Sequence, residues 1–170
     1  MILYVSNSFY IIVILLVICC FLDILYISLL KPLIYKTKAI KLLKKEGLKN
    51  KQVVHILKGK KEKCTFLAKI NEEVYRVKVL QSPKNSDIQI NNIDTFIAYV
   101  KSGDNLKAKN ISGMTSFMKS KLNNKIIIVP FKAKTIKKVI NECEMIMVNP
   151  DVDVHGTKIY NLNQYENLFK

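Results

Sequence analysis

The longest apolar run of the chain lies near its N-terminus. From Phe9 to Leu30 only Asp23 and Ser28 break the apolar pattern, and an α-helix of this length is roughly 33 Å long. That length matches the hydrocarbon thickness of a bilayer, so the pattern predicts a single transmembrane helix as an anchor over residues 1–30. A cleaved signal peptide is the alternative, but it needs a basic start, and the first basic residue here is Lys31.

An amphipathic pattern follows directly. The stretch LIYKTKAIKLLKKEG (33–47) places apolar residues at helical spacing, with Pro32 as a start signal and Gly47 as a stop signal. We predict a polybasic amphipathic juxtamembrane linker over residues 31–52 that contacts the anionic inner leaflet. The lysines assigned to the membrane surface are Lys36, Lys38, Lys41, Lys44 and Lys45. A solvated connector, or a helix packed on the following domain, is the alternative.

The period then changes to two, which is typical of β-strands. Three antiparallel strands are predicted by VVHIL (53–57), CTFLAKI (64–70) and EVYRVKVL (73–80). SPKNSDIQ (82–89) predicts a loop. Apolar residues at i, i+3, i+4 and i+7 predict a core-facing helix over 93–103, and a second helix is expected over 112–122.

The C-terminal part carries two short apolar runs. KIIIVPF (125–131) is typical of a strand buried on both faces. Helical spacing over 136–143, followed by MIMV (145–148), predicts a β-α-β unit with a parallel pair of strands, and NQYENLF (163–169) predicts a terminal helix. The fold class is therefore α/β: an N-terminal single transmembrane helix, then a small α/β sandwich domain with a mixed β-sheet over residues 53–170.

Positive charge is concentrated next to the predicted anchor. The 170 residues carry a net charge of +15, and residues 31–63 alone hold 12 lysines and two glutamates. No Lys or Arg precedes residue 31, so the positive-inside rule predicts an outside N-terminus and a cytoplasmic C-terminal domain. Arg76 is the single arginine. Lysine attracts phosphate as a point charge, so the basic composition does not by itself select nucleic acid.

Asp23 is the one ionisable carboxyl group inside the apolar run. A charged group at the centre of a span costs about 3 kcal/mol on insertion scales and usually faces a partner helix or a wet cavity. We assign Asp23 to an intramembrane contact with a second copy of the chain or with another membrane protein. A protonated or snorkelling carboxyl group is the alternative.

The elements around VYRVKV (74–79) give the chain a family resemblance. Their order resembles the Mrr-type branch of the restriction-endonuclease-like superfamily, over about residues 53–169, and that resemblance implies binding or cutting of DNA. In that family the third strand ends in Glu or Gln, any residue, then Lys, and Lys78 matches the lysine. Arg76 stands at the Glu or Gln position. The family also carries an acidic ligand of Mg²⁺ on the preceding strand, and the corresponding segment here, CTFLAKI, contains no Asp. Since a guanidinium group repels Mg²⁺, we expect binding rather than catalysis and no metal site.

A catalytic alternative stays open. If the chain is a nuclease, the resemblance implies that Lys78 orients the attacking water. Glu73 and Asp87, which are close to Lys78 in sequence, would then replace the missing acidic residues as carboxylate ligands of Mg²⁺. Without that activity no cofactor is expected, because phosphate-loop, dinucleotide and nucleophile-elbow motifs are missing from the sequence.

Basic residues of the third strand and of segment 105–125 are the predicted contacts to nucleic acid or phosphate. They are Arg76, Lys78, Lys107, Lys109, Lys119, Lys121 and Lys125. A solvated lysine face is the alternative. The first functional hypothesis is a membrane-anchored, non-catalytic protein whose basic cytosolic domain engages nucleic acid or the anionic membrane surface. The alternatives are a membrane-anchored Mg²⁺-dependent DNase and a subunit of a membrane protein complex.

Overall fold

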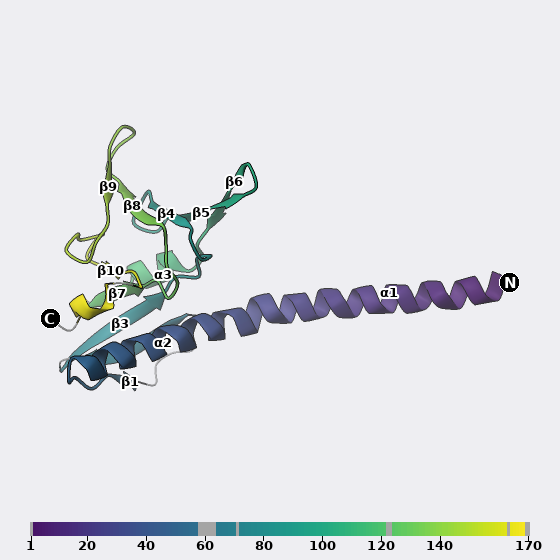
Figure 1. The fold of residues 1–170 in the computed structure, drawn as a ribbon, viewed down its shortest axis with the longest axis horizontal. Coiled ribbons are helices and arrows are strands. Elements are labelled where there is room, and N and C mark those ends of the chain that lie inside the picture. The colour runs from purple at the N-terminus through teal and green to yellow at the C-terminus, as the bar shows by residue number, and fades with distance from the viewer. Residues whose placement is uncertain (1, 58–63, 71, 122–123, 163, 169–170) are drawn as a thin grey trace. The chain divides into compact units, whose positions relative to one another are not determined.

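The computed structural model describes residues 2–57, 64–70, 72–121, 124–162 and 164–168 (Figure 1). The chain divides into two compact units, Met1–Ile34 and Tyr35–Lys170.

The first unit is helical. Helix α1 (Ile2–Leu25) continues through a π-helical turn, η1 (Tyr26–Leu30), into the start of α2 (Lys31–Lys49). From Phe9 to Ile24 its large apolar side chains are exposed, as Phe9 and Leu16 show at 64% and 61%. Among the described residues this helix, near the N-terminus, is the one long and apolar enough to cross a membrane. The predicted long apolar helix is thus confirmed.

The second unit contains a first mixed sheet, sheet A. Its strands lie in the order β1-β2-β3-β7-β10, with β1, β2 and β3 antiparallel, β7 parallel to β3 and β10 parallel to β7. The strand bounds are His55–Leu57 (β1), Thr65–Ile70 (β2), Glu73–Val79 (β3), Lys125–Ile128 (β7) and Lys158–Tyr160 (β10). The three predicted antiparallel strands are therefore confirmed.

A second mixed sheet, sheet B, has the order β6-β5-β4-β8-β9, in which only β4 and β8 are parallel. Its strands are Asp87–Ile90 (β4), Phe96–Ser102 (β5), Asn105–Asn110 (β6), Thr135–Val139 (β8) and Met145–Met147 (β9). Two short helical segments complete the unit: the α-helix Met114–Met118 (α3) and the 3₁₀-helix Tyr165–Leu168 (η2).

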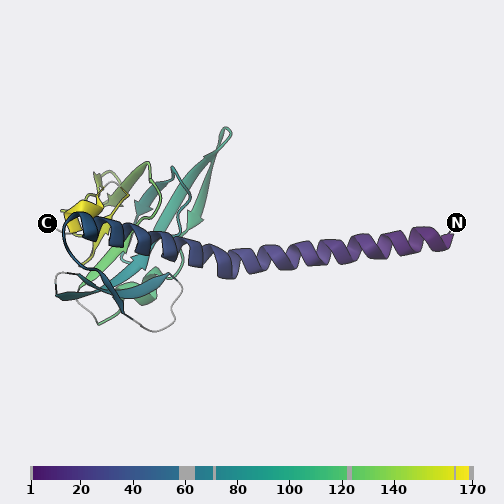
Figure 2. The same ribbon diagram turned by 60° about the horizontal axis from the view of Figure 1, so that its bottom comes forward.

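Helix α2 packs its apolar side on sheet A. Ala39 and Leu43, one helical turn apart, are both 0% exposed and share a hydrophobic cluster with Val77, Val79 and Ile128. Figure 2 shows α2 lying across the strands of this sheet. The predicted amphipathic helix is confirmed. Its apolar side packs on the domain, which is one of the alternatives that the sequence left open.

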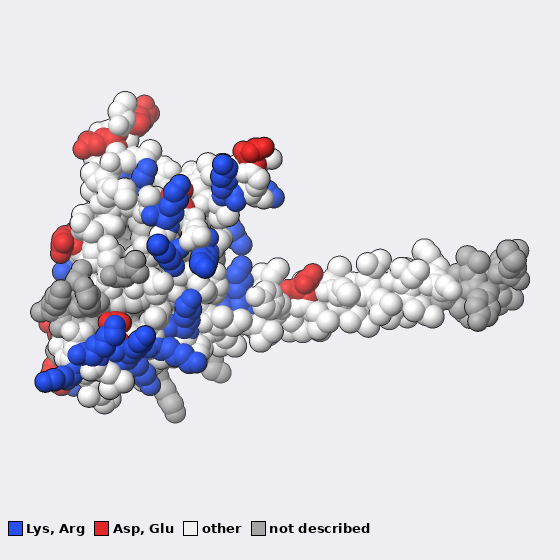
Figure 3. Space-filling view, viewed as in Figure 1, with Lys and Arg blue, Asp and Glu red and all other residues white. Residues whose placement is uncertain are grey.

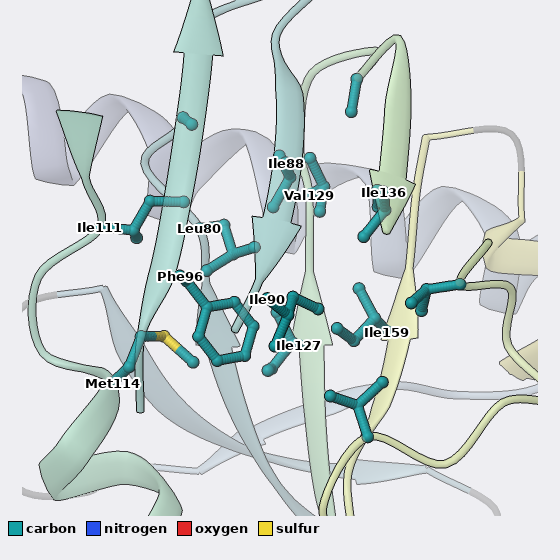
Figure 4. Packing of buried hydrophobic residues seen from close by; sticks show 14 of the residues in the cluster. Leu80, Ile88, Ile90, Phe96, Ile111, Met114, Ile127, Val129, Ile136 and Ile159 are labelled. Atoms are coloured by element: carbon teal, nitrogen blue, oxygen red, sulfur yellow. The ribbon is translucent and has the colours of Figure 1, made fainter. Parts of the chain in front are cut away.

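The opposite face of sheet A contributes to a second hydrophobic cluster, which also draws residues from sheet B and α3. Figure 4 shows Ile127 of β7 close to Ile90 and Phe96 of sheet B. Since Ile126 and Ile128 belong to the first cluster and Ile127 to the second, β7 is buried on both faces, as KIIIVPF predicts.

The predicted helix over 93–103 is wrong, because this segment contains strand β5. Ser102 pairs with Asn105 across Gly103 and Asp104, so a two-residue hairpin turn joins β5 to β6. Gly103 has a φ of 63°, a value that this kind of turn favours in glycine. Five consecutive apolar residues, 96–100, fit both the helical and the strand period, and the turn decides between the two.

Three further predictions need correction. The last residues of the predicted loop over 82–89 belong to strand β4, whose Ile88 and Ile90 both point into the second hydrophobic cluster. The predicted helix over 136–143 is β8 and a turn, so β9 returns antiparallel and the β-α-β unit is absent from the described residues. The MIMV segment is an outer strand with exposed methionines, and the terminal helix is a four-residue 3₁₀ turn.

Three of the four tyrosines packed in or near the first cluster have raised pKa values, and these predict an alkaline limit to stability. Burial raises the pKa of Tyr165, whose hydroxyl donates to the Val129 carbonyl, and burial also raises that of Tyr160. Burial and a hydrogen bond to Glu73 raise the pKa of Tyr75 to about 12. An unfolded tyrosine ionises near pH 10, so the contribution of these three tyrosines to the free energy of unfolding is fully present below about pH 10 and is lost as the pH rises toward 12.

The measurement is tyrosinate absorbance and circular dichroism across pH 8–13 for the parent chain and a Tyr165→Phe variant, so that lysine titration cancels in the comparison. We expect Tyr75, Tyr160 and Tyr165 to ionise above the pH at which an unfolded tyrosine ionises, because their pKa values are raised in the folded chain. Ionisation of all eight tyrosines near pH 10, with the native spectrum retained, would contradict the burial of these phenols.

Candidate functional site

Glu73 and Lys78 lie on the same strand, β3, but their side chains do not meet. Glu73 begins β3 and Lys78 is five positions further, which separates them by about 17 Å along an extended strand. Their side chains also point to opposite faces, since five is an odd number of residues. The Glu73 carboxylate accepts hydrogen bonds from the Tyr75 hydroxyl at 2.7 Å and from Asn124 at 3.4 Å.

Asp87 belongs to the other sheet. It begins β4, accepts a hydrogen bond from the Thr135 hydroxyl at 2.6 Å and lies 3.9 Å from the Lys134 ammonium. Because its neighbour Ile88 points into the second cluster, Asp87 faces the outer side of sheet B. The structure therefore does not bring Glu73, Lys78 and Asp87 together. Among the described residues no three His, Cys, Asp or Glu side chains gather as a metal site.

Lys78 lies inside the domain. Its residue is 6% exposed, and its neighbours across the sheet are Thr65 on β2 and Ile127 on β7. A Cβ atom added to Gly113 would lie 2.8 Å from the Lys78 Nζ. Gly113 also has a φ of 74°, so glycine suits this position both for its backbone and for the space it leaves to the lysine.

Two other predicted phosphate contacts meet the same short helix. The Arg76 guanidinium carbon lies 5.8 Å from the centroid of the Phe117 ring, and the Lys125 ammonium donates to the Met118 carbonyl at 2.7 Å. That carbonyl is at the C-terminal end of α3, where a positive charge is favourable. Arg76, Lys78 and Lys125 thus gather around α3, and we name these three residues the α3 cluster.

The remaining predicted contacts stay at the surface. Lys107 and Lys109 are on β6, whose six residues are all exposed, and they share one face of it. Lys119 and Lys121 follow α3 and are also exposed. The structure separates the seven predicted residues into the α3 cluster, the β6 pair and the residues after α3.

The lysines of α2 form a basic surface along one helix. Lys41, Lys44 and Lys45 are exposed, and Figure 3 shows basic side chains gathered along this helix. Lys36 and Lys38 lie over aromatic rings, at 5.8 Å from the Phe66 centroid and 3.6 Å from the Phe131 centroid. We call Lys36, Lys38, Lys41, Lys44 and Lys45 the α2 lysine row.

Asp23 is exposed on α1, where the side chains around it are apolar. It belongs to the first unit, whose described side chains do not give it a hydrogen-bond partner or an ion pair. Its predicted role in an intramembrane contact stays a prediction.

Sequence reasoning missed two features of these surfaces. The approach of Lys78 to Gly113 joins a strand to a segment 35 positions later, and no local pattern marks it. The acidic turn at Glu142 and Glu144 was expected inside or beside a helix, whereas it leads into an outer strand of sheet B. No family model, no curated protein and no solved structure matches this chain.

Proposed function

We propose that this chain is a single-pass membrane protein that acts by binding, and that the α2 lysine row engages the anionic inner leaflet. In this proposal α1 spans the bilayer, the N-terminus is outside, and the C-terminal unit is a cytoplasmic α/β sandwich. One observation carries it: the apolar side of α2 is already buried on sheet A, while Lys41, Lys44 and Lys45 of the same helix remain exposed, soon after the apolar helix in sequence.

Charge arithmetic supports the membrane as the ligand. A lysine near an anionic leaflet contributes about 1 kcal/mol, and this attraction falls off within a Debye length of about 8 Å at physiological salt. The α2 lysine row follows α1 and η1 in sequence. If α1 spans the bilayer, the row therefore stays near the leaflet without further binding energy. Lysine also suits diffuse attraction to lipid better than two-pronged contact with phosphate.

Nucleic acid is the second candidate ligand, favoured by the exposed lysines Lys107, Lys109, Lys119 and Lys121. The resemblance to the Mrr-type branch adds to this candidate and remains a proposal. The α3 cluster adds less, since Lys78 is buried and Lys125 bonds a helix carbonyl. A Mg²⁺-dependent DNase would have to assemble its carboxylates from residues that lie apart. A membrane complex subunit, contacted through Asp23, is the third proposal.

Lysine acylation in lipid vesicles tests the proposal. The full chain is placed in vesicles of neutral lipid or of neutral lipid mixed with phosphatidylserine, and mass spectrometry measures the labelling rate of each lysine. We expect Lys41, Lys44 and Lys45 to label about fivefold more slowly on anionic vesicles, since 1 kcal/mol corresponds to that factor. The protection should disappear in 1 M salt, where the Debye length is about 3 Å.

Lys107 and Lys109 serve as matched controls in the same chain, because they are exposed lysines on a different element. Equal labelling of the α2 lysine row on both kinds of vesicle would contradict the proposal. Protection of Lys107, Lys109, Lys119 and Lys121 by added duplex DNA would favour nucleic acid instead. Mg²⁺-dependent cutting of that DNA would favour the DNase.

A further inference from the structure

Sheet B ends in two outer strands that differ in charge. In the described part of the chain β6 forms one edge and β9 the other, and Figure 1 shows them at opposite ends of the sheet. Strand β6 carries Lys107 and Lys109, although Asp104 lies at its turn. Strand β9 is reached through a turn with Glu142 and Glu144, and Figure 3 shows acidic side chains over the tip of this hairpin.

Both edges also present apolar side chains to solvent. Leu106 on β6 is 64% exposed, and Met145 and Met147 on β9 are 52% and 58% exposed. An outer strand with exposed apolar residues is a template for pairing with another chain. The opposite charges of the two edges indicate that the partner of one edge is the other edge, on a second copy.

Backbone groups at the two edges point the right way for this pairing. Val148 N donates to Ile136 O and Ile140 N donates to Glu144 O, so the intervening Met145 and Met147 direct their backbone groups away from β8. On the other edge Ile111 N donates to Phe96 O. By the same alternation, Leu106, Ala108 and Asn110 direct their backbone groups away from β5.

We propose that β6 of one copy pairs with β9 of a second copy, so that sheet B continues from chain to chain. The two edge strands run in opposite directions, since β6 is parallel to β4 and β8 while β9 is antiparallel to β8. A second copy in the same orientation therefore presents β9 antiparallel to β6. This proposal does not rest on the function proposed above.

The extent of β9 and the charges select the register. Leu106 is opposite Met147 of the second copy, Ala108 is opposite Met145, and Lys109 is opposite Glu144. A shift of two residues one way places Ala108 opposite Cys143, outside the extended part of β9. A shift of two residues the other way leaves no lysine opposite Glu144.

Charge disfavours the symmetric alternative. Antiparallel pairing of β6 with β6 around Ala108 would place Lys107 opposite Lys109, and like charges directly opposite each other are destabilising. The proposed interface joins two different edges, so each copy can add another and the assembly is a ring or an open row. In such an assembly each copy contributes one β6 edge and one β9 edge.

Disulfide cross-linking tests the proposal. Full chains with Leu106→Cys or Met147→Cys are prepared in a background with Cys19, Cys20 and Cys143 replaced by Ser, and are placed in lipid vesicles. Opposed residues of this kind have Cα atoms about 5.5 Å apart, within the range of a disulfide. After mild oxidation we expect covalent dimers from a mixture of the two variants and none from either variant alone.

Charge variants make the test specific. Adding Lys109→Glu to the Leu106→Cys chain should lower the dimer yield about two- to fivefold, the effect of one cross-strand charge pair. Adding Glu144→Lys to the Met147→Cys chain should restore it. Dimers from an Ala108→Cys chain in the same background, in which symmetric pairing around Ala108 would place the two cysteines opposite each other, would replace the proposal with the symmetric pairing. An absence of dimers from the mixture, or a yield that charge reversal leaves unchanged, would overturn it.

Discussion

Replacing Leu43 with Ala is expected to lower the free energy of unfolding by about 2–5 kcal/mol, the usual cost of emptying a fully buried leucine site. Leu43 is 0% exposed and packs in the first cluster, between α2 and sheet A. Urea unfolding of the full chain in mild detergent, followed by circular dichroism, measures the change.

Leu48→Ala is the matched control, because it is the same substitution in the same helix at a residue that is 77% exposed. Its free energy of unfolding should differ from that of the parent chain by less than about 0.5 kcal/mol. Two equally small effects would mean that α2 does not pack on sheet A in solution. The predicted linker, with its apolar side on the lipid, would then be favoured.

Replacing Phe117 with Ala should lower the free energy of unfolding by about 3–5 kcal/mol. Phe117 is 0% exposed, belongs to α3 and packs in the second cluster. Phe117→Leu keeps most of the apolar volume and should cost less than about 1.5 kcal/mol. The same urea titration measures both variants, and equal costs would show that the ring does not fill a specific site.

A double-mutant cycle then asks whether Arg76 acts through this ring. Arg76→Met should cost about 1 kcal/mol in the parent chain, the contribution of a cation near an aromatic face, and less in the Phe117→Ala chain. An identical cost in both backgrounds would assign Arg76 a role other than contact with Phe117, and its predicted contact with phosphate would gain weight.

Predictions from sequence succeeded where the hydrophobic pattern of a segment fits only one type of secondary structure. The apolar run before Lys31 and the amphipathic pattern of 33–47 each match a single period, and both are helical. After Lys125, KIIIVPF is apolar without a break, and both faces of β7 are covered. The burial of such segments can be predicted from their own residues, without knowledge of their neighbours.

Predictions failed where a turn decides between two periods. The segments 93–103 and 136–143 each satisfy helical spacing, yet both are strands that end in tight turns. In the first the turn is set by Gly103, and in the second Ile140 N donates to Glu144 O, which closes the β8–β9 hairpin. Hydrophobic spacing does not contain this information, whereas turn chemistry does in part.

Placement of the candidate site depended on contacts distant in sequence. Strand alternation was enough to separate Glu73 from Lys78. It was not enough to place Lys78 beside Gly113 or Lys125 at the end of α3, because these contacts join segments from different parts of the chain. Because lysines are usually exposed, the sequence predicted that Lys78 contacts a ligand, whereas the structure buries it inside the domain.

The chain alternates between the two sheets, and this route has a consequence for folding. After β3 it leaves sheet A to form β4, β5 and β6, returns for β7, leaves again for β8 and β9, and ends with β10. A ribosome-bound chain that stops at residue 121 has three strands of each sheet and lacks the strand beside β3 and the strand beside β4. Neither sheet can then reach its final width alone, so both should form late and together in one cooperative transition, at the slow rate of long-range strand pairing.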